Sequence, residues 1–141
     1  MKSKAPLALM EQILMVLVFA LAAALCLQMF VFASQVADRC EAKDRAVLVV
    51  QNAAEVWKMN CGDPQKCVQQ LGGESSADGW YIEYNADWEE TSNGDAEYLV
   101  RAVPVASNDP LLGCADISAQ TVDGDCLFQV SIAWQEVVSD E

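Results

Sequence analysis

The 141-residue sequence contains no histidine, and this excludes several kinds of chemistry at once. Serine–histidine and cysteine–histidine catalysis need an imidazole as general base, and imidazole is also the commonest metal ligand. The sequence has no Gly-rich phosphate-binding loop and no pair of cysteines with two residues between them. We therefore predict a protein that is not an enzyme, and a secreted enzyme is the weakest alternative.

Basic residues are scarce, with 8 Lys and Arg against 21 Asp and Glu. From Ser34 onward, six basic and twenty acidic residues give a net charge of −14. Nucleic-acid backbones are bound by Lys and Arg, so we expect no nucleic-acid partner. The simplest role of this negative charge is solubility, and a divalent cation or a basic partner is the alternative.

Helix breakers are missing from a long stretch, because no glycine precedes Gly62 and no proline lies between Pro6 and Pro64. Beyond residue 33, apolar residues recur at spacings of three, four or seven, as in an amphipathic helix: Val36, Cys40, Val47, Val50, Ala54 and Trp57. We predict one helix over residues 7–59, about 80 Å long, with Gly62 as its C-terminal cap. The stripe is expected to pack on a sheet, and a coiled-coil dimer is the alternative.

Charges are almost absent from the first third of the chain, where residues 13–33 have Gln28 as their one polar member. A membrane-spanning helix needs about 20 apolar residues. Lys2 and Lys4 lie on the short side of this segment, so the positive-inside rule predicts a single-pass protein with a cytoplasmic N-terminus. Residues 34–141 would then be extracellular or periplasmic. A signal peptide cut after Ala33 is another fate of this segment.

The residues before and inside the apolar run form a recognisable pattern. Lys2-Ser3-Lys4 is a short basic leader, and Leu7-Ala8-Leu9-Met10-Glu11 opens the apolar helix. This arrangement resembles the N-terminus of type IV pilins and type II secretion pseudopilins. In that family a prepilin peptidase cuts before the apolar run, and a glutamate stands at the fifth mature position. The resemblance makes Leu7 the first mature residue and Glu11 the carboxylate that pairs with the amino terminus of a neighbouring copy.

The resemblance also implies a function and partners. It implies a non-enzymatic structural subunit, of minor-pilin type, in a type IV pilus, competence or type II secretion filament system, held in the membrane before assembly. Its partners would be copies of itself or related subunits through the N-terminal helix, the membrane, and a prepilin peptidase. The expected organisation is a leader or cytoplasmic tail (residues 1–6), a transmembrane helix (7–33), its amphipathic continuation (34–59) and a globular β head (60–141).

Pro6 departs from the family pattern, which has Gly or sometimes Ala just before the cut. Proline restricts the backbone and removes an N–H group. The alternative is therefore an uncut, single-pass protein with an extracellular binding or scaffold domain. In that case Glu11 is a solvated charge favoured by the helix dipole.

The rest of the sequence predicts an α+β fold, in which the long helix packs on a three- to four-stranded antiparallel sheet. Alternating apolar residues indicate strands over residues 80–88, 97–106 and 126–138. Residues 61–79 are loop-like, with a short helical turn over residues 64–71. Ser92-Asn93-Gly94-Asp95 is a hairpin turn signal, and Pro104 is expected at an edge or a bulge.

Six cysteines remain to be placed. We predict local disulfides between Cys61 and Cys67 and between Cys114 and Cys126, which would bracket a loop before the last strand, with free thiols as the alternative. Cys26 is an apolar filler, and Cys40 lies on the buried stripe or is exposed for interchain pairing. Four-cysteine zinc binding is disfavoured because the paired knuckles are missing.

Two loops, residues 87–97 and 121–126, concentrate carboxylates. We expect solvated turns there and no cofactor. The alternative is calcium, which takes six to eight oxygen ligands and which major pseudopilins bind in a head loop.

Overall fold

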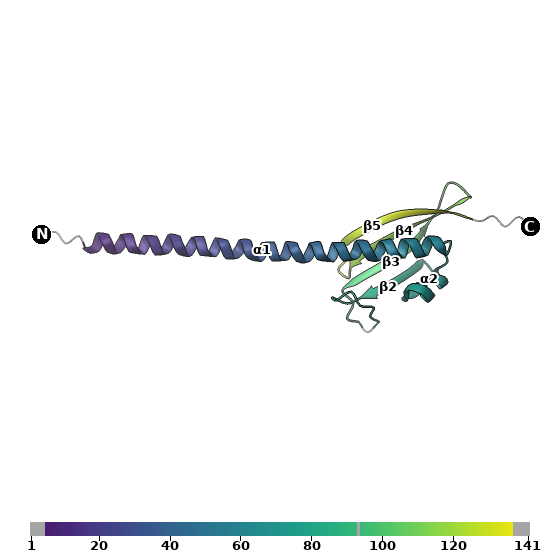
Figure 1. Cartoon of the computed structure of the whole chain (residues 1–141), viewed down its shortest axis with the longest axis horizontal. Helices are drawn as coiled ribbons and strands as arrows, with labels where there is room; N and C mark the ends of the chain where they lie inside the picture. Colours follow the sequence, from purple (N-terminus) through teal and green to yellow (C-terminus); the bar gives the residue numbers. More distant parts are fainter. Residues whose placement is uncertain (1–4, 93, 137–141) are drawn as a thin grey trace, which may run out of the picture. The chain divides into compact units, whose positions relative to one another are not determined.

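The computed structural model describes residues 5–92 and 94–136 of the chain. Two helices and five strands follow one another in the order α1 (Ala5–Met59), α2 (Pro64–Leu71), β1 (Glu74–Ser76), β2 (Gly79–Tyr84), β3 (Tyr98–Val105), β4 (Leu112–Thr121) and β5 (Cys126–Gln135) (Figure 1). The predicted α+β class is confirmed. The chain divides into two compact units, Met1–Cys40 and Glu41–Glu141.

The long helix α1 is continuous because nothing in its sequence interrupts the backbone ladder. Pro6 lies in its first turn, where a missing N–H group removes no hydrogen bond of the helix. Two backbone hydrogen bonds end the helix. The N–H of Gly62 donates to the carbonyl of Trp57 (3.0 Å), and the N–H of Cys61 donates to the carbonyl of Lys58 (3.1 Å). This pair of bonds is a Schellman motif. Its left-handed residues are Cys61 (φ 51°) and Gly62 (φ 77°), so the predicted cap includes a cysteine as well as the glycine.

Helix α2 covers the short helical turn predicted over residues 64–71, and its N-terminus is capped. The Asp63 carboxylate accepts from the N–H groups of Gln65 (3.0 Å) and Lys66 (3.4 Å), and Pro64 occupies the first turn. Such a cap stabilises a helix by about 1 kcal/mol. The helix buries Cys67 against the core.

The sheet is an antiparallel meander in chain order, β1-β2-β3-β4-β5, and so has more strands than the three or four predicted. β4 replaces much of the expected loop between Cys114 and Cys126. Its buried residues are Ala115, Ile117 and Ala119. Alanine is depleted in strands, so the alternation of β4 is faint in the sequence. β1 is a three-residue polar strand with all residues exposed.

The other strands differ from the prediction mainly at their ends. β2 stops at Tyr84 instead of residue 88 because the Asn85 side chain accepts from the N–H groups of Asp87 (3.0 Å) and Glu89 (2.9 Å). In β3, Pro104 lies beyond Ala102, the last residue that β2 pairs. Its missing N–H therefore removes no hydrogen bond to β2. This agrees with the expectation that Pro104 lies where a strand pairing ends. β2 and β3 are antiparallel neighbours, but the turn signal includes Asn93, which lies outside the described residues.

The core lies between the last third of α1 and one face of the sheet. Its buried members are Ala46, Val50, Ala53, Ala54, Trp57, Cys67, Trp80, Ile82, Val100, Ala102, Ala115, Ile117, Ala119 and Ile132. The predicted stripe is correct for Val50, Ala54 and Trp57. It is wrong for Val36 and Cys40, which are exposed in the single chain. They precede Glu41, where the unit that contains the sheet begins.

The Trp134 side chain of β5 packs against the backbone of Gly62, just after α1, and of Gly113 in β4. A β-carbon at Gly62 or at Gly113 would overlap the Trp134 ring, and Gly113 is also the cross-strand partner of Trp134. The absence of side chains at these two positions therefore makes room for the indole.

We predict that Gly113→Ala lowers the free energy of unfolding by about 1–3 kcal/mol, because the added methyl group overpacks the site. Denaturant unfolding of the detergent-solubilised chain measures the change. In a Trp134→Leu background the same substitution should lower the free energy of unfolding by less, because the clashing ring is gone. Equal effects of Gly113→Ala in the two backgrounds would contradict the contact.

Candidate functional site

The first candidate site is the apolar part of α1, residues 6–33, whose side chains are all exposed in the single chain. Seventeen large apolar side chains between Leu7 and Phe32 are 54–76% exposed. Burying such side chains stabilises by about 1.5–3 kcal/mol each, so the segment as a whole favours an apolar environment by on the order of 20 kcal/mol or more. That exceeds the stability of a typical domain. α1 is long and apolar enough to cross a membrane.

Both residues predicted for assembly lie on this segment. Leu7 is 73% exposed and Glu11 is exposed as well. They are four residues apart on a continuous helix, so they share one face. Among the described residues, Glu11 has no basic side chain within ion-pair distance. It is the one acidic residue before Asp38.

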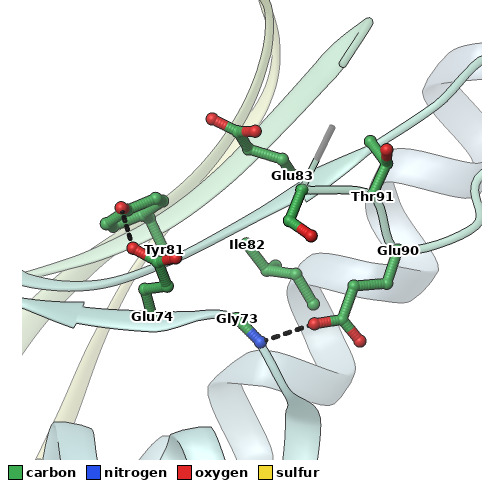
Figure 2. A pocket seen from close by; sticks show the side chains of 8 residues that line it. Gly73, Glu74, Tyr81, Ile82, Glu83, Glu90 and Thr91 are labelled. Carbon is green, nitrogen blue, oxygen red and sulfur yellow. Dashed lines mark hydrogen bonds between the residues drawn. The ribbon is translucent and has the colours of Figure 1, made fainter. Parts of the chain in front are cut away.

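A second candidate site is a hollow of about 290 Å³ beside β1 and β2. Figure 2 shows the carboxylates of Glu74, Glu83 and Glu90 around it. Glu90 accepts from the backbone N–H of Gly73 (2.8 Å), and Glu74 accepts from the hydroxyl of Tyr81 (2.6 Å). Two of the three carboxylates therefore already have a donor from the chain itself.

The acidic loop over residues 87–97 is held by protein contacts. The ring of Trp88 stacks on that of Tyr98 with centroids 4.3 Å apart and lies 5.8 Å from that of Tyr84. Glu90 reaches across to the Gly72–Gly73 turn, where a β-carbon at Gly72 would overlap its carboxylate. No sequence pattern pointed to these contacts, because the partners are far apart along the chain.

These contacts give the loop a structural role. No group of three or more His, Cys, Asp or Glu arranged to hold a metal is found in the part of the chain that the structure describes. The expectation of no cofactor stays a prediction, with calcium in this loop as its alternative.

No disulfide joins the cysteines among the described residues. The predicted Cys114–Cys126 disulfide is wrong for this fold: Cys114 pairs with Ala133, whereas Cys126 pairs with Gln120 at the other end of the hairpin. The two are about 20 Å apart along β4, and a disulfide needs α-carbons within about 7 Å. Cys61 is exposed while Cys67 is buried. Cys40 is exposed, which leaves the interchain alternative open.

Four groups outside the apolar segment, one cysteine and three tyrosines, have a raised pKa. Burial raises the pKa of the Cys67 thiol. The pKa of Tyr81 is raised by its hydrogen bond to Glu74. Burial, and then the charge of Glu90, raises the pKa of Tyr84. Tyr98 has a raised pKa from burial and from Glu97.

We predict that all three tyrosines have a pKa above the ordinary value of 10.0. The folded state holds these protons more tightly than the unfolded chain does. Their contribution to stability is therefore complete below the unfolded pKa of about 10 and is lost as pH rises through the folded values. Tyrosinate absorbance measures the titration. Glu74→Ala should lower the pKa of Tyr81, and an unchanged titration curve would contradict the bond.

We predict that Cys67 reacts with a thiol reagent at least about a hundredfold more slowly than Cys61 or Cys126, because reaction requires opening of the core. Mass spectrometry of the labelled chain measures the three rates. In denaturant the three should become equal. If Cys61 and Cys67 could be labelled only after reduction, the predicted Cys61–Cys67 disulfide would be supported. That outcome would contradict the unpaired cysteines of this structure.

No family model, curated protein or solved structure matches this chain. What the chain does is therefore inferred from its own residues, above all the apolar segment of α1 and Glu11.

Proposed function

We propose that this chain is a non-enzymatic, pilin-like or pseudopilin-like subunit that is held in a membrane and then assembles into a filament through its N-terminal helix. One observation carries the proposal. The first part of α1 is an exposed apolar helix with a single carboxylate, Glu11, one turn after Leu7. The filament would belong to a type IV pilus, competence or type II secretion-type system.

The apolar segment supports storage in the membrane. A helix satisfies all its interior backbone hydrogen bonds within itself, which is a condition for crossing hydrocarbon. Lys2 and Lys4 favour a cytoplasmic N-terminus. The acidic unit that contains the sheet would then be extracellular or periplasmic, where its charge keeps it soluble.

Glu11 supports assembly. A carboxylate within a membrane helix is unfavourable unless it is paired, and Glu11 lies near the entrance of the apolar segment. A free amino terminus at Leu7 of a neighbouring copy would supply the missing positive charge and set the register between helices. Packing of the seventeen apolar side chains of one copy against those of the next would then replace their contacts with lipid.

The second candidate function is that of an uncut, single-pass anchor for an extracellular binding or scaffold domain. Pro6 favours it, because the related family has a small residue at the position before the cut. In that case Met1 is retained, and Glu11 lies at headgroup level as a solvated helix N-terminal charge.

The mature N-terminus, determined by intact mass and terminal sequencing from the membranes of the native host, separates these functions. A start at Leu7 would support processing and assembly. A start at Met1 would favour the plain anchor. A start at Ser34 would contradict both, because the apolar helix would be absent from the mature protein.

We predict that Glu11→Ala reduces assembly of the chain at least about tenfold, equivalent to about 1.4 kcal/mol, while membrane insertion is unchanged or improved. Crosslinking between single-cysteine copies labelled along residues 13–30 measures assembly in membranes. Gln12→Ala is the matched control, because Gln12 is an uncharged neighbour on the same helix. Equal crosslinking in the two variants would favour the plain anchor.

A further inference from the structure

Strand β5 forms one of the two edges of the sheet. In the order β1-β2-β3-β4-β5, its one strand partner among the described residues is β4, and Figure 1 shows it as the last strand on its side of the sheet. The opposite edge, β1, is three residues long, whereas β5 is ten residues long. The long edge therefore presents a row of backbone groups that can pair with another strand.

The composition of β5 is unusual for an exposed edge. Proteins commonly protect such edges with charged residues, proline or short length. The sequence of β5, CLFQVSIAWQ, contains no charged residue, proline or glycine. It is the longest uncharged run after Asp38 in a chain of net charge −13. One protective feature is present at its start, where the register shift between Ala119 and Gln120 leaves Leu127 as an extra residue.

The backbone groups that are free on this edge follow from the register. The N–H of Glu136 donates to the carbonyl of Leu111 (2.9 Å). Hydrogen-bonded and non-hydrogen-bonded pairs alternate along an antiparallel ladder. Hence Trp134, Ile132, Val130 and Phe128 bond to β4, and the residues between them direct their N–H and C=O groups outward. These outward residues are Gln129, Ser131, Ala133 and Gln135.

We propose that β5 pairs with β5 of a second copy of this chain, in an antiparallel arrangement centred on Ser131. The outward groups of Ser131 would meet those of the partner's Ser131, and those of Gln129 would meet those of the partner's Ala133. About six backbone hydrogen bonds would form. This register pairs the regular part of the strand over its full length.

The side chains of β5 are complementary to themselves in this register. Phe128 would lie opposite the partner's Trp134, and Val130 opposite the partner's Ile132, on the face toward the core. These would be non-hydrogen-bonded pairs, in which side chains are closest, and aromatic and β-branched pairs contribute about 0.2–1 kcal/mol each. Phe128, Val130 and Trp134 are only half-buried in the single chain. A second copy would cover them.

Charge opposes the association, and one carboxylate acts at the strand itself, because Asp116 of β4 accepts a hydrogen bond from the Ser131 hydroxyl. Two acidic copies repel each other, and Asp125 and Glu136 flank β5. The repulsion is screened within a Debye length of about 8 Å at 0.15 M salt, against about 30 Å at 0.01 M. Pairing through β5 should therefore strengthen with ionic strength, whereas association through ion pairs would weaken. The inference does not depend on filament function, because a permanently anchored protein would have the same edge.

Hydrogen exchange of the full chain in excess detergent micelles, over a range of protein concentrations and at two salt concentrations, tests the proposal. We expect the amides of Gln129, Ser131 and Ala133 to exchange freely in dilute samples and to become protected as concentration and salt rise. Ser131→Glu should raise the dimer dissociation constant at least tenfold, because the two glutamates would face each other beside the Asp116 carboxylates of both copies. Ser131→Pro, which removes an outward N–H without removing a bond to β4, should do the same.

Ser118→Glu is the control. Ser118 of β4 pairs with Gln129 on one side and with Arg101 on the other, so its glutamate makes the same change in charge one strand away from the edge. All variants keep the apolar helix, so association through that helix is equal among them. The proposal is overturned if the three amides exchange freely at every concentration, or if Ser131→Glu and Ser118→Glu behave alike. If the three amides became protected only when another protein of the host was added, a second copy of this chain would not be the partner of β5.

Discussion

The contact between the last third of α1 and the sheet is the interaction on which the rest of the structure depends. Trp57 and Val50 are fully buried there, and three alanines of the helix (Ala46, Ala53, Ala54) are buried beside them. Small side chains allow a helix to approach a sheet closely, and the same cluster includes Ala115 and Ala119 of β4. Without this contact the sheet would expose the apolar face of β2, β3, β4 and β5, and an isolated meander cannot exclude water from that face.

The same helix meets opposite physical requirements along its length. Up to Cys40 its side chains are exposed, and from Glu41 onward one stripe is buried against the sheet. Its backbone needs no partner in either part, because the hydrogen bonds are internal. The change therefore lies in the side chains alone: large apolar residues surround the first part, while charged residues such as Lys43 and Asp44 line the solvent side of the second. This division supports a subunit that is stored in lipid by one part and folds independently with the other.

The acidic second unit carries its charges on the solvent side of α1, in loops and at exposed or half-exposed strand positions, and aromatic and backbone contacts hold its loop over residues 87–97. Trp88 stacks on Tyr98, and Glu90 bonds to the Gly73 amide, so a loop rich in carboxylates is ordered by the chain itself. Charge is absent from β5, the strand that would most need protection if it remained unpaired. The self-pairing of β5 and the assembly of the apolar helix would act on different surfaces of the same chain.

The sequence by itself determined the elements that depend on local patterns. The absence of breakers defines α1, the short helix over residues 64–71 was recognisable after it, and alternating apolar residues indicate most of β2, β3 and β5. Leu7 and Glu11 were singled out by the resemblance to the pilin N-terminus, and the continuous helix puts them on one face. Tertiary structure decided the rest: β4 is a strand because it pairs with β3 and β5 and buries its alanines in the core, and its register separates Cys114 from Cys126. The exposed edge of β5 likewise follows from strand order, which depends on long-range pairing that no local pattern specifies.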